Sequence, residues 1–339
     1  MRQVLLESPR RLVVTEAPRP TPAPGEVLVK VGATAICGTD LHIYNGEAKA
    51  ALPRVPGHEV AGTIEDVGLG VSDFERGDRV AVNPILSCGS CELCIMGREN
   101  LCPQGGLLGR ESDGSLREYL TIPSRQAFKL PPNIPFEEAA LIQPLSTAVH
   151  AQRQALITVT DSVVVVGQGA AGLMHTRLAK LSGAFPVIAV GRSQWKLELA
   201  QQMGADVTVS GAGGDAVSEV LQLTGGLGTD VVIEAVGSPD TFQQALQMVR
   251  PGGRVVLYGL SPHPVPTLDV YSIYLKEARL LFPRANTPAD FHLAVAMVAA
   301  GRIDLKPLIS KSYRLEGAAS AFRFAEEERR QVLRVVINP

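Results

Sequence analysis

Two rhythms of hydrophobic and polar positions divide the chain. Up to about residue 145, apolar or alternating runs are short, and each ends at a turn signal such as Pro24-Gly25. They predict strands over VLLES, RLVVTEA, EVLVKVGATAI, HEVAGTIEDVG and DRVAVNP. From about Asp161 a strand, a glycine turn and a helix repeat, beginning at SVVVVG, PVIAVG and TDVVIEAVG and closing on RVVLYGL. The first part is expected to form an irregular β-barrel, and the second a parallel, doubly wound α/β sheet.

The pattern changes again past Pro283. A helix is predicted there, because apolar residues recur on one of its faces at Phe291, Ala294, Val295 and Val298. The tail RQVLRVVINP is typical of a strand, and we expect it to return to the first domain. The predicted division is residues 1–146 with 285–339 for one domain and residues 147–284 for the other.

Composition and charge exclude several classes of protein. The length of 339 residues fits two domains better than one core. Hydrophobic residues make up 45% and charged residues 19%, with 32 Lys and Arg against 34 Asp and Glu, which disfavours disorder and general binding of nucleic acid or anionic lipid. No apolar run reaches the roughly 20 residues of a membrane span, and the N-terminal segment lacks a secretory pattern. We therefore expect a cytoplasmic protein without nucleic-acid or membrane partners.

A glycine turn follows the apolar run at residues 163–166. Gly167, Gly169 and Gly172 have GxGxxG spacing and stand directly before a helical segment. The first glycine allows a tight turn, the second lets the backbone approach a pyrophosphate, and the third lets helix and strand pack closely. Phosphate would bind at the helix N-terminus, where free amide groups favour an anion. The strand and helix on either side favour a dinucleotide site over a merely structural turn.

The end of the next strand bears on the choice between NAD and NADP. An acidic residue there normally binds the adenosine ribose in NAD enzymes, but this chain has Gly191. Arg192, Ser193 and Lys196 follow and offer donors for a 2′-phosphate. The pattern favours NADP, with NAD still possible. The alternative is that Arg192 and Lys196 only begin a solvated helix.

Four of the five cysteines lie close together as CxxCxxCx7C, at Cys88, Cys91, Cys94 and Cys102. The odd total and this clustering favour metal ligation in a reducing compartment over a disulfide framework. Four thiolates can close a tetrahedral shell around a structural zinc, in a lobe expected at about residues 86–104. An iron-sulfur cluster also uses four cysteines, but its known spacings differ.

The remaining thiol, Cys37, stands in the segment ICGTDLH, and His58 and Glu59 follow about twenty residues later. A thiolate, an imidazole and a carboxylate are ligands that zinc accepts, and three protein ligands leave a position open for substrate. Together these residues predict a catalytic metal site. Taken singly, Cys37 could be a buried apolar residue, His58 a loop histidine and Glu59 a surface charge.

The order of these motifs resembles the zinc-dependent medium-chain dehydrogenases, the superfamily of alcohol, polyol and threonine dehydrogenases. The resemblance covers nearly the whole chain, through ICGTDLH, PGHEVAGTIEDVG, GDRVAV, the four-cysteine lobe, GxGxxG and PGGRVVLYG. It implies a GroES-like catalytic barrel, a Rossmann dinucleotide-binding domain and two zinc ions per chain. It also implies hydride transfer between a secondary alcohol and NAD(P), in a homo-oligomer that is a tetramer or a dimer.

By the same resemblance, Cys37, His58 and Glu59 bind the catalytic zinc, while Thr39 and His42 pass the substrate proton to solvent. His42 is otherwise a loop residue without a role. The family commonly has a glutamate in an EPL segment where this chain has Gln143. Gln143 is expected either to bind the zinc weakly, through its amide oxygen or a water, or only to pack near the cofactor.

The segments that bear on the identity of the substrate resemble different branches of the family. The segment CGTDLHIYN is closest to threonine dehydrogenases, whereas QPLSTAVHA and the segment from Arg284 to Thr287 resemble sorbitol and xylitol dehydrogenases. We favour a polyol or sugar-type alcohol, with Arg284 near cofactor and substrate; otherwise Arg284 is a surface or interdomain charge. Two rivals are a zinc-ribbon module that binds nucleic acid, which the near-neutral charge disfavours, and a non-catalytic NADPH-binding zinc protein.

Overall fold

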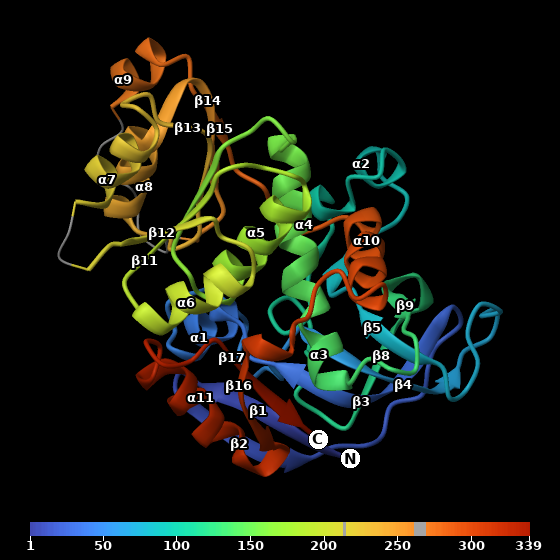
Figure 1. Ribbon diagram of the computed structural model, residues 1–339. Coiled ribbons are helices and arrows are strands. Elements are labelled where there is room, and N and C mark those ends of the chain that lie inside the picture. The colour runs from blue at the N-terminus through green and yellow to red at the C-terminus, as the bar shows by residue number, and fades with distance from the viewer. Residues whose placement is uncertain (213–214, 261–268) are drawn as a thin grey trace. The chain divides into compact units, whose positions relative to one another are not determined.

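The computed structural model describes residues 1–212, 215–260 and 269–339 (Figure 1). By their internal contacts these residues form two compact units. One contains Met1–Thr147 and Ala285–Pro339, and the other contains Ala148–Arg284. The first unit is therefore discontinuous in the sequence.

The first unit is built mainly of β-strands. Its strands are β1 (Arg2–Ser8), β2 (Arg11–Glu16), β3 (Glu26–Ala35), β4 (Glu59–Val67), β5 (Arg79–Val82), β6 (Ile85–Leu86), β7 (Gly106–Leu107), β8 (Tyr119–Pro123), β9 (Ala127–Lys129), β16 (Ile309–Arg314) and β17 (Arg334–Asn338). Its helices are α1 (Gly38–Tyr44), α2 (Glu92–Ile95), α3 (Phe136–Ala140), α10 (Pro288–Ala299) and α11 (Ala318–Glu327), with 3-10 turns at Glu99–Leu101, Ser124–Gln126, Lys306–Leu308 and Leu315–Gly317. Helix α4 (Ile142–Ala155) begins in this unit and ends in the other.

One sheet joins distant parts of the first unit, in the order β16-β17-β3-β4-β5-β9, and β8 also pairs with β3. Strand β17 runs antiparallel to β3 with Ile337 opposite Thr34, so the C-terminal strand does return to this unit. Alternate side chains of β3, such as Val27, Val29 and Val31, enter a core that β4, β5 and β8 complete. This alternation is the reason that the sequence pattern located these strands.

The second unit is a parallel sheet covered by helices. Its strands are β10 (Val163–Val166), β11 (Val187–Gly191), β12 (Val207–Ser210), β13 (Thr229–Glu234), β14 (Val249–Leu257) and β15 (Arg279–Leu281). Its further helices are α5 (Ala170–Leu181), α6 (Gln194–Gln202), α7 (Ala216–Leu223), α8 (Pro239–Met248) and α9 (Val270–Leu275).

The strand order of this sheet is β12-β11-β10-β13-β14-β15, and every neighbouring pair is parallel. The chain moves outward from β10 in one direction and, after returning to β13, outward in the other. The predicted doubly wound α/β fold is therefore confirmed. In such sheets ligands bind beyond the carboxyl ends of the strands, where the order reverses, which is here between β10 and β13.

No helix among the described residues has the length and apolar content needed to cross a bilayer.

Candidate active site and metal centres

The four cysteines of the lobe converge on one point. Cys91 caps the N-terminus of α2, Cys94 lies within that helix, and Cys102 follows the 3-10 turn Glu99–Leu101. Their sulfur atoms are 3.5 Å apart for Cys91 and Cys94, 3.6 Å for Cys88 and Cys102, and 3.9 Å both for Cys88 and Cys94 and for Cys91 and Cys102. Four sulfurs at about 2.3 Å from one zinc in a tetrahedron would lie about 3.8 Å from each other. The lobe therefore fits a tetrahedral zinc.

The environments of two of these thiols differ. Hydrogen bonds from the backbone of Ser90 and Cys91 lower the pKa of Cys88 to about 6. Burial raises the pKa of Cys94 to about 12. A bound cation would favour the thiolate form of both, because metal ligation requires deprotonated sulfur.

A second group of possible ligands forms where β3 ends and β4 begins. Antiparallel pairing sets Ala35 opposite Glu59, so Cys37, two residues past Ala35, lies beside the start of β4. The ligand atoms of Cys37, His58 and Glu59 all lie within 4.8 Å of one another. His58 and Glu59 are buried, and Cys37 is half-buried. The structure thus brings together the three residues that the sequence singled out.

A buried carboxylate that the sequence analysis missed, Asp40, connects the two segments of this group. Its Oδ2 accepts a hydrogen bond of 2.9 Å from the Cys37 amide, and its Oδ1 accepts one of 3.1 Å from the Gly57 amide. The same Oδ1 lies 3.4 Å from His58 Nδ1, which leaves Nε2 of His58 for a metal. Burial alone would lower the pKa of His58, but Asp40 and Cys37 outweigh it and hold this pKa well above its usual value.

Glu59 provides the test of whether a cation fits. Its side chain is fully buried, and neither carboxylate oxygen has a hydrogen-bond partner among the described residues. Arg334 Nη2 lies 3.1 Å from Glu59 Oε1 as an ion pair. Burial raises the pKa of Glu59, opposed by the charges of Arg334 and His58. A buried carboxylate that faces one arginine and lies beside a thiol and an imidazole is part of a donor set that fits a metal ion.

The other predicted residues of this unit have different settings. Thr39 and His42 are half-buried on α1, three residues apart and therefore on one face of the helix. His42 Nδ1 lies 2.6 Å from Glu47 Oε2. Gln143 is buried near the start of α4.

In the second unit, the glycine turn has the geometry of a phosphate-binding loop. Gly167 has a φ of +94°, and a Cβ on Gly172 would lie 1.8 Å from the Gly167 carbonyl oxygen, so helix α5 could not pack there with any other residue. Gly169 caps α5, yet among the described residues a Cβ at that position would meet no atom within 4 Å apart from its immediate chain neighbours. The space in front of Gly169 is therefore open to a ligand at the helix N-terminus.

The residues that follow β11 and were predicted to bind the 2′-phosphate differ in their exposure to solvent. Gly191 closes the strand, and a side chain there would press on Leu197 and Gln168, at 3.1 and 3.2 Å. Arg192 is exposed and Ser193 caps α6, whereas Lys196 is buried, which lowers its pKa. The structure thus presents Arg192 but not Lys196 at the surface. Arg284, which follows β15, is also exposed.

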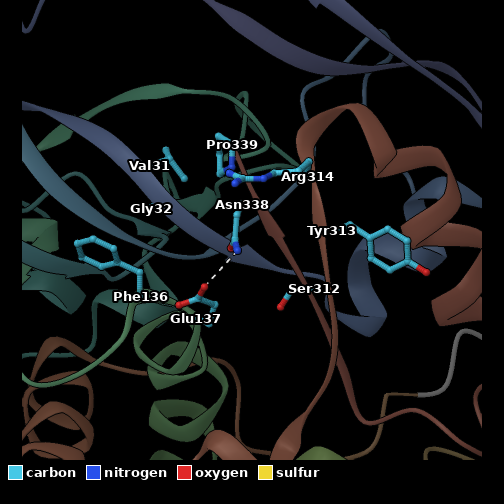
Figure 2. Close-up of a pocket in the computed structure, with 9 residues that line it drawn as sticks. All are labelled: Val31, Gly32, Phe136, Glu137, Ser312, Tyr313, Arg314, Asn338 and Pro339. Carbon is cyan, nitrogen blue, oxygen red and sulfur yellow. Dashed lines mark hydrogen bonds between the residues drawn. The ribbon is translucent and has the colours of Figure 1, made fainter.

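A pocket of about 500 Å³ lies elsewhere in the first unit (Figure 2). Residues of β3, α3, β16 and β17 line it, among them Phe136 and Arg314, and Asn338 donates a hydrogen bond of 3.1 Å to Glu137 across it. None of the predicted ligand or cofactor residues lines this pocket. It is therefore separate from the candidate active site.

Comparisons with known proteins identify the class of protein that this fold and these sites define. Residues 23–132 match the alcohol dehydrogenase GroES-like domain, and residues 170–300 match the zinc-binding dehydrogenase domain. The L-threonine 3-dehydrogenase of Pyrococcus horikoshii is 37% identical over 89% of this chain and 88% of its own length. The sorbitol dehydrogenase of Bacillus subtilis is 34% identical over 100% of this chain and 97% of its own length.

A solved structure described as a zinc-binding dehydrogenase from Sinorhizobium meliloti, bound to NADP, is similar over 100% of this chain and 99% of its own, with a TM-score of 0.93 and 32% identity. The chain belongs to the zinc-dependent medium-chain dehydrogenase family, with a GroES-like and a Rossmann-type domain. It is an alcohol dehydrogenase that uses NAD(P), as the resemblance implied.

Proposed function

We propose that this dehydrogenase depends on zinc and oxidises a secondary alcohol of the polyol or sugar type, or reduces the corresponding carbonyl compound. The observation that carries the proposal is the group of Cys37, His58 and Glu59, whose ligand atoms lie within 4.8 Å of one another. A non-catalytic zinc protein would need the cysteine lobe but not this second group.

The residues of this group would have different roles at the catalytic centre. Cys37 and His58 would hold a zinc ion directly, Glu59 would ligate it or stand beside it, and Gln143 is the candidate for a further, weak ligand. A zinc ion bound there supplies Lewis acidity, which lowers the pKa of a substrate hydroxyl toward neutrality. Asp40 fixes the orientation of the His58 ring, and Arg334 balances part of the charge of Glu59.

We propose that Thr39 and His42 carry the substrate proton to solvent. Both lie on one face of α1, the helix that Cys37 caps, so one short element would fix the metal ligand and the proton path together. His42 is half-buried and lies 2.6 Å from the exposed Glu47, which can take a proton on toward water.

We propose that NADP is the preferred cofactor and binds at the carboxyl edge of the parallel sheet. The open space at Gly169 suits the pyrophosphate, and the absence of an acid at Gly191 together with the exposed Arg192 suits the 2′-phosphate. Bound cofactor supplies hydride chemistry, while Gly167, Gly172, Ser193 and Arg192 shape the site. The buried Lys196 makes Arg192 the main candidate for discrimination.

Threonine is the second candidate substrate, favoured by the segment CGTDLHIYN and by the 37% identity to a threonine dehydrogenase. Polyols and threonine share a secondary hydroxyl next to a carbon that bears a second polar group. A screen of polyols, sugars, threonine and simple alcohols, each with NAD and NADP and with or without added zinc, tests the proposal. Turnover of a polyol that is lost on chelation and restored by zinc supports it; preferred turnover of threonine would replace the polyol assignment.

We further propose that the protein is a cytoplasmic homo-oligomer, a dimer or a tetramer. Helix α9 exposes Val270, Tyr271, Tyr274 and Leu275 by 62% to 75%, and β15 is the last strand of its sheet. An exposed apolar surface, and separately an end strand of a sheet, are features that suit pairing with a second copy of the chain. Light scattering of the parent and of Tyr274→Glu tests this, since the variant should shift the mass toward the monomer.

A further inference from the structure

A buried glutamate closes the central strand of the dinucleotide-binding sheet. Glu234 is the last residue of β13 and is only 1% exposed. Its Oε1 accepts hydrogen bonds from the Val236 amide at 2.8 Å, from the Gly237 amide at 2.9 Å and from the Thr241 hydroxyl at 2.8 Å, and its Oε2 accepts a longer one of 3.2 Å from Gly237. The side chain therefore acts as an acceptor that fixes the turn between β13 and α8.

This turn packs closely against the loops on either side of it, through a Val236 methyl group on the Gly167 side and through backbone on the Gly259 side. A Cβ on Gly167 would lie 2.4 Å from a methyl carbon of Val236, so the turn rests directly on the first glycine of the GxGxxG loop. A Cβ on Gly259, after β14, would lie 2.2 Å from the Gly237 amide nitrogen. The loops that follow β10, β13 and β14 thus pack closely side by side. Glu234 holds the middle one, which is the turn between β13 and α8.

We propose that Glu234 is a positioning residue for the dinucleotide cofactor. By fixing Val236 and Gly237, it sets the surface on which Gly167 packs, and thereby the shape of the loop that faces the cofactor at the point where the strand order reverses. The inference rests on the proposed binding of the cofactor at this edge. It concerns how tightly the cofactor is bound rather than the chemical step.

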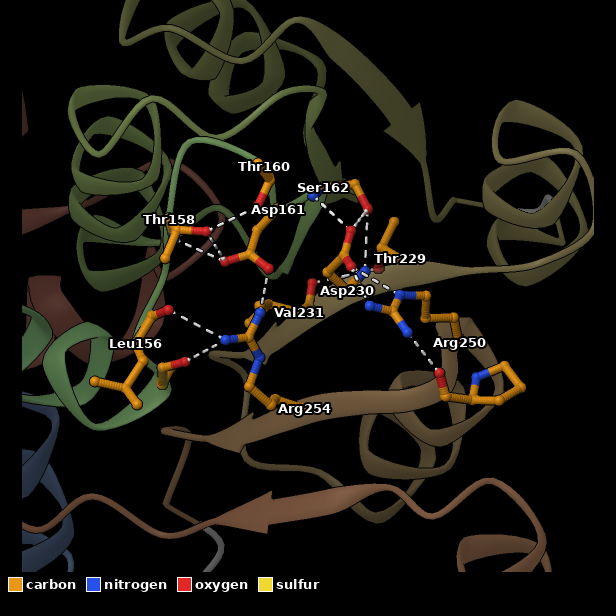
Figure 3. Close-up of polar contacts among 12 residues, drawn as sticks. Leu156, Thr158, Thr160, Asp161, Ser162, Thr229, Asp230, Val231, Arg250 and Arg254 are labelled. Atoms are coloured by element: carbon orange, nitrogen blue, oxygen red, sulfur yellow. Dashed lines mark hydrogen bonds and ion pairs between the residues drawn. The ribbon is translucent and has the colours of Figure 1, made fainter.

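The opposite end of the same strand offers a matched control. Asp230, near the start of β13, accepts hydrogen bonds from the amide and hydroxyl of Ser162 at 2.8 and 2.6 Å and from Arg250 at 2.7 Å, while Arg254 pairs with Asp161 nearby (Figure 3). These contacts also tie neighbouring strands together, but they lie at the amino ends, about 13 Å of strand away from Glu234. Loss of the Asp230 contacts should therefore affect stability without affecting the cofactor.

The test compares cofactor affinity with stability in three variants. Glu234→Met keeps the length and volume of the side chain but removes the acceptor, so the Kd for NADPH, measured by fluorescence titration, should rise by about 10- to 100-fold. Glu234→Gln keeps the oxygen that receives most of the hydrogen bonds and should stay within about threefold of the parent. Asp230→Asn should lower the melting temperature and leave the Kd within about twofold of the parent.

The outcomes separate the two hypotheses. If the parent binds neither NADPH nor NADH, the proposed function is wrong. If the parent binds NADPH and Glu234→Met binds it equally well, or if Asp230→Asn weakens binding as much as Glu234→Met does, only the positioning role is wrong. Should Glu234→Met not fold, Thr241→Val removes a single donor to Oε1; a smaller rise in Kd for NADPH supports the role, and an unchanged Kd overturns it.

Discussion

Asp40 Oδ1 lies 3.4 Å from His58 Nδ1, while Oδ2 of the same carboxylate accepts the amide hydrogen of Cys37. One buried side chain therefore contacts both segments that supply the candidate zinc ligands. Carboxylates in this position fix the tautomer and the orientation of a ligating histidine. The geometry of the candidate metal site therefore depends on a residue that does not itself belong to the ligand group.

Asp40→Asn should weaken zinc binding at this site by about 10- to 100-fold, because the amide group would present a donor to the Gly57 amide or to His58. Competition with a chromogenic chelator measures this affinity. Glu47→Gln, which alters the exposed partner of His42, is the control and should leave zinc affinity unchanged. Equal affinity in the parent and in Asp40→Asn would show that the carboxylate does not support the metal.

Arg192→Ala should weaken the binding of NADP by roughly 10- to 100-fold and barely change the binding of NAD. A charge-assisted hydrogen bond to a phosphate contributes about 1.5 to 3 kcal/mol, which corresponds to that factor. Parallel titrations with NADPH and NADH measure the ratio. Lys196→Ala is the matched comparison, because its buried setting predicts the smaller change in discrimination. If Arg192→Ala lost the same affinity for NADPH and for NADH, Arg192 would not be the residue that recognises the 2′-phosphate.

Gln143→Glu should keep both zinc ions but move the alkaline rise in alcohol oxidation to higher pH. An added negative charge near the metal raises the pKa of a bound alcohol, because it weakens the pull of the ion. Gln143→Ala addresses ligation itself and should lose zinc to a chelator faster than the parent if the amide oxygen is a ligand. An unchanged pH profile together with unchanged chelator kinetics would remove Gln143 from the metal site.

We expect His175 to contribute to the loss of folding stability at acid pH. It is fully buried on α5, and burial lowers its pKa to about 3. Because the unfolded chain keeps a histidine pKa of about 6.5, the stabilisation is complete above that pH and is lost as the pH falls, by at most about 1.4 kcal/mol per unit. Urea unfolding of His175→Gln between about pH 7 and 5 should show a flatter loss than the parent. The exposed His292→Gln is the control, and an equally steep loss in His175→Gln would contradict the assignment.

What the sequence could predict depended on local spacing. The GxGxxG turn, the four-cysteine lobe and the alternating strands each occupy a short window, so the fold class followed from them. Strand β12 was not predicted, because Val207–Ser210 is too short to stand out from its flanking residues. Helix α7 was not predicted either. The burial of Lys196 was also not foreseen, since its place on the inner face of α6 depends on packing against the sheet.

Two residues that support the candidate metal site, Asp40 and Arg334, were not predicted from the sequence. Asp40 had a local signal, because it is the third residue of the helix that Cys37 caps and its side chain reaches back to the Cys37 amide. Arg334 had none, since it is far from Glu59 in the sequence, and only the pairing of β17 with β3 brings it near. Ion pairs formed by such long-range strand pairing cannot be read from spacing.

The chain is proposed to hold one catalytic and one structural zinc. Zinc released by acid and counted per chain, with turnover and melting temperature measured on the same samples, tests it in the parent, in Cys37→Ser and in Cys94→Ser. We expect two zinc ions in the parent; Cys37→Ser should lose one ion and its turnover while staying folded, and Cys94→Ser should melt at a lower temperature, because a closed four-cysteine site contributes folding energy. A single zinc ion in the parent, or parental turnover in a Cys37→Ser protein that has lost one ion, would contradict the account.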